Sequence, residues 1–156
     1  MNIKIGTLEE FPNYIETIAQ IASEEFGLTK EFYLSSFVNA KTFLAFHYGC
    51  LVGFVCIDKE DLNYKKYKQI NNWLADLYVL KPFRKKGIAS KLVDHALQKN
   101  EQEEIWTWTE HKYVMNFLLQ KGFKVKDMVV IEKKPIFIMS KKNLTFSFLY
   151  NFPSLL

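Results

Sequence analysis

The stretch Arg84-Lys85-Lys86-Gly87-Ile88-Ala89 decides how this chain is interpreted, because it joins an apolar run to an amphipathic one. Residues 73–80, just before it, form an apolar run typical of a strand. Residues 88–99 place apolar side chains on one face at helical spacing and polar ones on the other. The stretch is therefore predicted to be a basic turn between a strand and a helix.

Such a turn favours the binding of an anion. The first amides of a helix have no partner within the helix and carry the positive end of its dipole. Gly87 allows close approach of the backbone, the small Ala89 leaves space, and three basic side chains add charge. The expected ligand is a phosphate or pyrophosphate. The glycines of a P-loop or a dinucleotide fingerprint are missing, and the alternative is a solvated basic turn.

Composition is that of one folded domain. The chain has 156 residues, of which 49% are hydrophobic and 16% aromatic, enough for a core of its own. A net charge of +4 suits an anionic ligand and is too small to indicate nucleic acid by itself. Cys50 and Cys56 are expected to be free, buried cysteines. There is no signal-peptide pattern and no apolar run of membrane-spanning length, so a cytoplasmic protein is expected.

The order of elements predicts the fold class. The predicted strands are residues 2–6, 42–48, 51–58, 73–80, 104–109, 124–131 and 135–140, and the predicted helices are residues 12–26, 29–38, 88–99 and 112–121. This order predicts an α/β (α+β) fold with a mixed, mostly antiparallel central sheet of about six to seven strands and helices on both faces. Residues 1–143 are predicted to be the domain, and residues 144–156 an apolar C-terminal extension of it.

Three further motifs accompany the basic turn: Leu77-Tyr78-Val79 before it, Gly122-Phe123 after the last predicted helix, and Met139-Ser140-Lys141 at the end of the last predicted strand. Together these residues resemble the GNAT superfamily of acyl-CoA-dependent N-acyltransferases. In that family a strand ending in a Leu-x-Val-like run leads into Arg/Gln-x-x-Gly-x-Gly/Ala and a long helix. Leu77-Tyr78-Val79 followed by the basic turn match this pattern. Gly122-Phe123 match the end of the family's next signature, and Met139-Ser140-Lys141 match its usual last strand. The resemblance covers roughly residues 2–143.

The resemblance implies that acetyl-CoA (coenzyme A) is the cofactor. Its pantetheine arm would pair with the backbone of Tyr78, Val79 and Leu80 like an added strand, which requires the fourth and fifth strands to splay apart. The pyrophosphate would lie on the amides of the basic turn. The implied cofactor residues of that turn and its surroundings are Arg84, Lys85, Lys86, Gly87, Ile88, Ala89 and Ser90, with His111 as a further candidate.

The resemblance also implies direct attack of an amine on the thioester. The backbone N–H near Val79 is the candidate donor to the developing oxyanion, and Asp76 is the candidate base. A structural carboxylate is the alternative role of Asp76. The tyrosine that often protonates the departing thiolate is replaced by Leu118, and Tyr113 is a candidate substitute. Ala75 replaces an acidic residue that the family often has before the Asp-Leu-x-Val-like run.

The acceptor and the partners are less closely defined. Trp106 and Trp108 share a strand face, and lining the acceptor cleft and packing in the core are both open to them. The acceptor is a small-molecule amine or a protein amine; no metal, nucleic-acid or membrane partner is expected. Our hypothesis for the uncharged residues 144–156 is that they support a homodimer. The rival functions are a CoA-binding protein with little or no catalysis, favoured by Ala75 and Leu118, and a basic nucleic-acid module.

Overall fold

A computed structural model describes residues 1–59, 65–100 and 102–142 of the chain. This part of the chain forms one seven-stranded sheet in the order β1-β2-β3-β4-β5-β7-β6. The strands are β1 (Ile3–Thr7), β2 (Lys41–His47), β3 (Cys50–Asp58), β4 (Trp73–Val79), β5 (Glu104–Thr109), β6 (Lys124–Ile131) and β7 (Lys134–Lys142). All neighbours are antiparallel except β4 and β5, which are parallel. The predicted mixed, mostly antiparallel sheet is confirmed.

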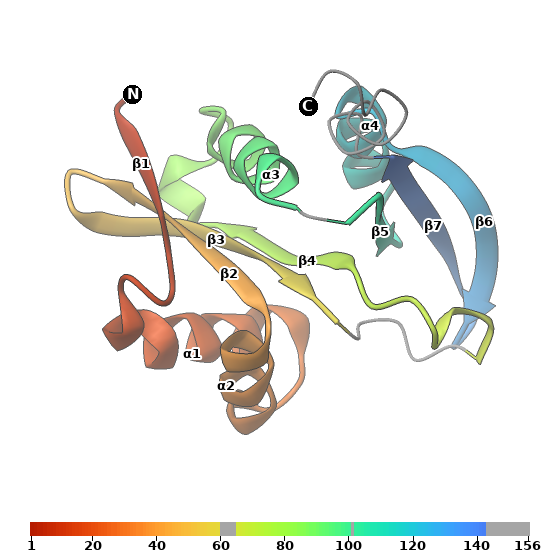
Figure 1. Cartoon of the computed structure of the whole chain (residues 1–156), viewed down its shortest axis with the longest axis horizontal. Coiled ribbons are helices and arrows are strands. Elements are labelled where there is room, and N and C mark those ends of the chain that lie inside the picture. The colour runs from red at the N-terminus through yellow and green to blue at the C-terminus, as the bar shows by residue number, and fades with distance from the viewer. Residues whose placement is uncertain (60–64, 101, 143–156) are drawn as a thin grey trace, which may run out of the picture.

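Helices cover both faces of the sheet, as the element order predicts (Figure 1). The helices are α1 (Ile15–Phe26), α2 (Lys30–Asn39), α3 (Ile88–Gln98) and α4 (Lys112–Gln120), with short 3-10 turns η1 (Pro12–Tyr14), η2 (Lys65–Tyr67) and η3 (Lys81–Phe83). In Figure 1, α1 and α2 lie below the sheet, whereas α3 and α4 lie above it. Pro12 begins a 3-10 turn, one turn earlier than the α-helix itself, which starts at Ile15.

Local sequence signals set the helix ends. α1 ends at Gly27, which adopts a φ of 89°, a left-handed conformation that glycine takes without a steric penalty. α2 begins after Thr29, whose hydroxyl accepts a hydrogen bond from the Phe32 amide at 3.1 Å. Glycine and threonine are typical of these two positions, so each helix end follows from residues close to it in the chain.

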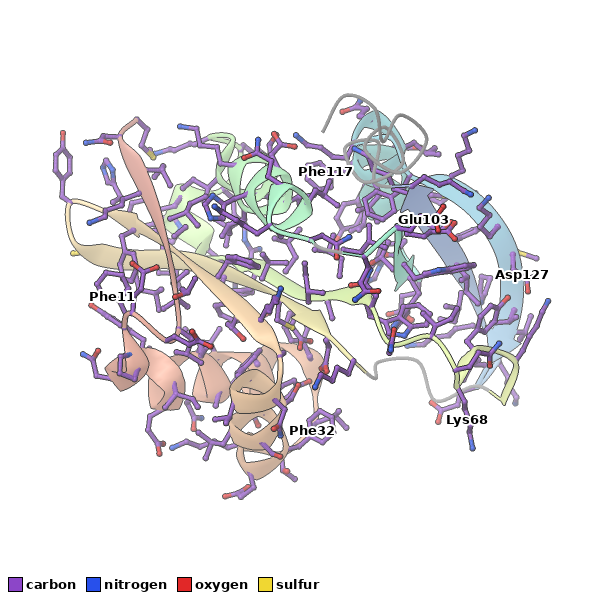
Figure 2. All side chains as sticks on the ribbon, in the orientation of Figure 1. Phe11, Phe32, Lys68, Glu103, Phe117 and Asp127 are labelled. Carbon is purple, nitrogen blue, oxygen red and sulfur yellow. The ribbon has the colours of Figure 1, made fainter. Side chains whose placement is uncertain are left out.

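Two hydrophobic layers hold the helices onto the sheet. Above the sheet, Leu92 of α3, Ile105 of β5 and Leu118 of α4 are buried in one cluster. Figure 2 shows Phe117 between α3 and α4, where it packs against this cluster. Below the sheet, α1 and α2 pack on a second cluster that includes Ala75. Trp73 lies two residues before Ala75 on β4 and therefore faces the same side of the sheet. A third cluster, formed by Trp73 with Tyr67, Ile136 and Ile138, thus also lies on this lower face.

The parallel pair β4–β5 diverges after its first residues. Trp73 and Trp106 are the register partners of this pair, and the Trp106 amide donates to the Asn72 carbonyl at 3.0 Å. The buried Thr107 hydroxyl adds a bond to the Leu74 carbonyl at 2.9 Å. No register partner in β5 accompanies residues 74–79 among the described residues. The predicted splay is therefore confirmed, and it opens the sheet toward the end of β4.

The remaining sequence expectations concern the two cysteines, residues 144–156 and membrane-spanning segments. Cys56 is buried as expected, but Cys50 is exposed, because it directly follows the β2–β3 turn at Tyr48-Gly49. The predicted extension, residues 144–156, lies outside the described residues, so the proposed dimer contact stays a prediction. No described helix is both long enough and apolar enough to cross a membrane.

Candidate active site

A bulge in β4 determines where the Asp76 side chain points. Asp76 has a φ of 54°, and the pairing of β3 with β4 shifts register between Phe54 and Cys56. In a regular strand Ala75 and Asp76 would face opposite sides of the sheet. The bulge instead brings the Asp76 carboxylate to Cys56, which lies in the same lower cluster as Ala75. The carboxylate is thereby directed to the face covered by α1 and α2.

The surroundings of Asp76 favour its protonated form. The pKa of the Asp76 carboxyl is raised to about 6, mainly by burial; a hydrogen bond from Cys56 opposes this rise, and the nearby charge of Asp58 adds to it. The Cys56 sulfur lies 3.5 Å from Asp76 Oδ2. A carboxyl with a pKa near the working pH can both accept and release a proton, as a general base must. The geometry therefore supports a chemical role for Asp76.

At the end of β4, backbone groups point alternately toward β3 and toward the β4–β5 gap. The Leu80 amide donates to the Val52 carbonyl at 2.9 Å, so Leu80 is bonded to β3. Hydrogen bonding alternates along antiparallel strands, so the Val79 amide and carbonyl point away from β3 into the β4–β5 gap. Of Tyr78, Val79 and Leu80, only Val79 thus has an amide that points into the gap, as a donor to the developing oxyanion must.

Gly53 of β3 makes this geometry possible. A Cβ atom at Gly53 would lie 2.7 Å from the Tyr78 carbonyl oxygen, a backbone atom that moves only with β4. We expect Gly53→Ala to push β4 outward, to lower stability by about 1–3 kcal/mol and to weaken CoA binding several-fold. Gly6→Ala is the matched control, since its Cβ would meet the Phe11 ring at 2.6 Å, and a side chain can rotate away. Calorimetric titration with CoA checks both; equal affinities for the two variants would contradict the expectation.

The basic turn has the backbone that an anion site needs. Lys85 and Gly87 have φ values of 60° and 82°, and Gly87 caps the N-terminus of α3. Apart from its neighbours in the chain, no described residue has an atom within 4 Å of the Cβ position of Gly87, so the space above it is open in the described part of the structure. The Ile88 side chain is buried in the upper core, whereas Lys85 and Lys86 are exposed. The turn therefore combines an anchored helix start with exposed cations and an open backbone.

Arg84 connects this turn to β4. Its Nε donates to the Val79 carbonyl at 2.8 Å, and its guanidinium lies 5.3 Å from the centre of the Tyr78 ring. Tyr78 in turn donates from its hydroxyl to Glu25 of α1 at 3.4 Å. Arg84 therefore stabilises the end of β4 as well as adding positive charge to the turn.

Lys121, which the sequence interpretation did not select, adds a further cation near the start of α3. Its ammonium donates to the Ser90 hydroxyl and lies 2.9 Å from Asp94 Oδ1. Gly122 has a φ of 92°, which ends α4 and lets the chain enter β6. Only the tertiary fold brings Lys121 to Ser90, although its position before the Gly122-Phe123 motif was a usable signal.

Three of the residues considered for the site, His111, Tyr113 and Leu118, lie on α4 or at its N-terminus. Leu118 is buried in the upper core, so the position of the absent tyrosine carries no proton donor. His111 is the N-cap residue of α4, but its side chain makes no capping bond; its ring stacks on Tyr113 at 5.4 Å instead. Tyr113 is 73% exposed. The roles of His111 and Tyr113 in catalysis or cofactor binding stay predictions.

The two tryptophans lie on the lower face, the face of Asp76. Trp106 and Trp108 are both half-buried and pack against a cluster that contains Tyr67 and Trp73. The Tyr67 hydroxyl and the Lys66 ammonium both bind Asp127 of β6, which Figure 2 labels. This contact ties the segment before β4 to the β6–β7 hairpin and supports the aromatic cluster. Both tryptophans are thus partly core residues and partly accessible.

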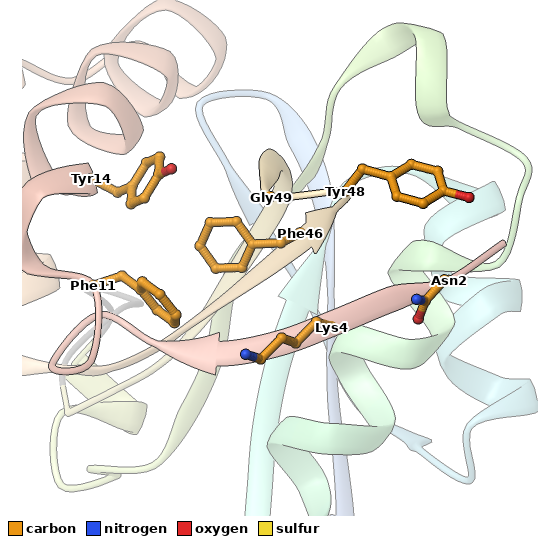
Figure 3. A pocket seen from close by; sticks show the side chains of 7 residues that line it. All are labelled: Asn2, Lys4, Phe11, Tyr14, Phe46, Tyr48 and Gly49. Atoms are coloured by element: carbon orange, nitrogen blue, oxygen red, sulfur yellow. The ribbon is translucent and has the colours of Figure 1, made fainter.

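A shallow aromatic pocket lies elsewhere, at the β1 edge (Figure 3). Phe46 forms its centre, with the rings of Phe11 and Tyr14 at 4.9 Å and 5.3 Å from it. Lys4 and Asn2 of the β1 region line its rim. Because β2 and β3 separate β1 from β4, this pocket is not part of the site around Asp76 and Val79.

Comparison with known proteins agrees with this architecture. The acetyltransferase (GNAT) family matches residues 10–123. Among solved structures, Arabidopsis thaliana Naa50 in complex with the bisubstrate analogue CoA-Ac-MVNAL is 19% identical, covers 91% of this chain and 99% of its own, and has a TM-score of 0.68. The Escherichia coli ribosomal-protein-S18-alanine N-acetyltransferase is 14% identical, with coverage of 90% and 94% and a TM-score of 0.70. A search of curated protein sequences gave no match.

An aminoglycoside 6'-acetyltransferase of type Ii is similar to the same degree. It is 19% identical, covers 92% of this chain and 98% of its own, and has a TM-score of 0.69. The family match spans most of the chain, so the chain belongs to the acetyltransferase (GNAT) family. The enzyme class that this membership gives is an N-acetyltransferase, whereas the likeness to the three solved structures extends to the fold alone.

Proposed function

We propose that this protein transfers an acetyl group from acetyl-CoA to a primary amine, by direct attack of the amine on the thioester. The observation that carries the proposal is the placement of two groups on β4, next to its divergence from β5. The Val79 amide points into the β4–β5 gap, and the bulge next to it directs a carboxyl with a pKa of about 6 to the lower face. The family match supports the general class of the reaction.

The residues present fit an acyl-CoA. A diphosphate needs exposed cations and backbone amides that it can approach closely, and the turn from Arg84 to Gly87 supplies both beside the start of α3. Lys121 adds an ammonium at Ser90, in the first turn of that helix. When bound, acetyl-CoA supplies an activated acyl group with a thiolate as leaving group. A thiol pKa near 8.5 makes that thiolate a fair leaving group without full protonation.

The protein's own residues then have three tasks. The Val79 N–H stabilises negative charge on the reacting carbonyl oxygen, a contribution typically of about 10²–10³ in rate. Asp76 takes a proton from the ammonium form of the acceptor, directly or through water, because an alkyl amine is mostly protonated at neutral pH. Arg84 holds the Val79 carbonyl and so keeps the end of β4 in place. The buried Leu118 leaves the thiolate without a donor from that position.

The acceptor would approach from the lower face. Asp76, Trp106 and Trp108 all belong to that face. Glu25 of α1, on the same side of the sheet, accepts a hydrogen bond from the Tyr78 hydroxyl. The S18-alanine enzyme is named for a protein acceptor and the type Ii enzyme for an aminoglycoside, while Naa50 was solved with the bisubstrate analogue CoA-Ac-MVNAL, so the fold accommodates both classes of acceptor. A small-molecule amine and a protein amine are therefore both within the proposal.

Release of CoA thiol from acetyl-CoA across a panel of amines and peptides tests this function. An acceptor-dependent release well above the rate of hydrolysis is expected for at least one class. Saturable binding of CoA with no release above background for any acceptor would instead support the rival, a CoA-binding protein without catalysis.

Arg84→Glu is expected to weaken CoA binding at least tenfold while the fold stays intact. The substitution reverses a charge beside the turn and removes the donor to the Val79 carbonyl, and one tenfold step corresponds to about 1.4 kcal/mol. Lys4 is an exposed residue of β1, so Lys4→Glu makes the same charge change far from the turn and is the control. Titration calorimetry with CoA checks the difference, and unchanged affinity in Arg84→Glu would count against the site.

A further inference from the structure

Cys56 lies directly beside the bulge of β4. It belongs to β3, is fully buried and pairs with Ala75 in the sheet register. The register of the two strands shifts immediately before Cys56, where the extra residue of β4 is accommodated. Its thiol therefore faces the point at which the chain departs from regular strand geometry. Nothing in the reaction described above uses this thiol.

The thiol sits between two oxygen acceptors. Its sulfur lies 3.5 Å from the Ala75 carbonyl oxygen and 3.5 Å from Asp76 Oδ2. A thiol has a single proton to donate and a sulfur that accepts weakly. An ionised Asp76 is the stronger acceptor of the two, since hydrogen bonds to charged groups are the stronger ones. A protonated Asp76 can itself donate to sulfur, and the thiol proton is then free to turn to the Ala75 carbonyl.

We propose that Cys56 is a positioning residue for Asp76. Its thiol holds the Asp76 carboxylate on the lower face when the carboxylate is ionised, and turns to the Ala75 carbonyl when Asp76 carries a proton. The Asp76 carboxyl can thus remain hydrogen-bonded to Cys56 beside the bulge in both its ionised and its protonated form. The inference rests on the proposed function, in which Asp76 is the base.

Other charged groups near Asp76 act differently. The charge of Asp58, also on β3, raises the pKa of Asp76. Asp58 itself accepts a hydrogen bond at its Oδ2 from the Ser36 hydroxyl of α2, at 2.8 Å. Glu25 of α1 accepts from the Tyr78 hydroxyl. These groups are bonded to partners that a change at Cys56 leaves in place. Substituting Cys56 therefore alters one donor to Asp76 without changing the neighbouring charges.

The test compares Cys56→Ala and Cys56→Ser by the dependence of kcat/KM on pH. Loss of the thiol donor disfavours the ionised form of Asp76, so the rise of kcat/KM with pH should occur at higher pH in Cys56→Ala than in the wild type. We expect kcat/KM of this variant to be roughly threefold lower near pH 6 and near normal above about pH 8. A hydroxyl is a stronger donor than a thiol, so Cys56→Ser should keep the limb in place or move it to lower pH. Cys50→Ser, at an exposed site, is the control and should change neither.

A purely structural role would give a different result. Activity lowered by one factor at every pH, with the limb unmoved in both Cys56 variants, would overturn the inference. If Asp76→Asn leaves the limb in place, the base assignment fails instead, so the two failures are distinguishable. Titration of the Asp76 carboxyl carbon by NMR in the ligand-free protein needs no turnover and no acceptor. Equal midpoints for wild type, Cys56→Ser and Cys56→Ala would likewise overturn the inference.

Discussion

Asp76→Asn is expected to lower kcat/KM by about 10²–10⁴ while CoA still binds, because the amide cannot take the proton of the acceptor. The substitution keeps the shape of the side chain and leaves the turn at Arg84 to Gly87 untouched. Steady-state kinetics with the acceptor found in the panel measure the loss. Calorimetric titration with CoA checks that the cofactor site is retained. Wild-type kcat/KM in this variant would show that Asp76 is only a structural carboxylate.

The same substitution is expected to stabilise the protein at neutral pH. The pKa of Asp76 rises from 3.8 in the unfolded chain to about 6 in the folded protein, so folding favours the protonated form. The stability contributed by that form is fully present below about pH 4 and is lost as the pH rises through about 6. Asparagine avoids this loss. We expect Asp76→Asn to raise the free energy of unfolding by about 1–3 kcal/mol near pH 7.5 and to have little effect near pH 4.

Asp127→Asn is the control for the sign of this effect. Hydrogen bonds from Tyr67 and Lys66 lower the pKa of Asp127, so its contribution to stability is present above the unfolded value and is lost in acid. Its replacement should lower stability at neutral pH and leave CoA binding unchanged. Denaturant unfolding at the two pH values measures both variants. A destabilised Asp76→Asn at neutral pH would contradict the account of the buried carboxyl.

Gly87→Val is expected to reduce CoA affinity about 10²-fold. The new side chain would stand in the open space above Gly87, where the diphosphate is proposed to lie, and would deny it roughly two hydrogen bonds of about 1.5 kcal/mol each. Valine at a φ of 82° is also strained, which by itself destabilises the turn.

Gly49→Val separates strain from the loss of a binding site. Gly49 has a φ of 78° and, like Gly87, has no atom of a described residue other than its chain neighbours within 4 Å of its Cβ position, but it lies in the β2–β3 turn. The two variants should therefore lose similar stability in thermal unfolding. Calorimetric titration should show weakened CoA binding in Gly87→Val alone. Equal affinities in the two variants would place the diphosphate away from this turn.

Much of the fold was predictable because its signals are local. The amphipathic pattern of residues 88–99, the cap at Thr29 and the left-handed glycine at Gly27 each depend on near neighbours in the chain. The element order then favours a mixed, mostly antiparallel sheet, and the structure shows that β4 and β5 are its parallel neighbours. Cys50 was predicted wrongly because the pattern did not separate the end of a strand from the turn beside it.

The site was less predictable, because its geometry depends on pairing between strands. Regular alternation predicts opposite faces for Ala75 and Asp76, and the register shift of β3 against β4 overrides it. Lys121 stands before the Gly122-Phe123 motif, but its contact with Ser90 joins residues 31 positions apart, so that local signal does not specify the contact. The burial that raises the pKa of Asp76 likewise comes from elements packed around it.

The sequence by itself determined the order of strands and helices, the basic turn before α3 and the resemblance to one family, since each of these depends on residue type and short spacing. The tertiary structure alone decided where β4 and β5 part, just beyond Trp73 and Trp106, which backbone group at the end of β4 faces the gap, and that a bulge turns Asp76 toward Cys56. The reason is that a hydrogen-bond register and a buried charge are properties of paired and packed chain segments, and no single segment carries them.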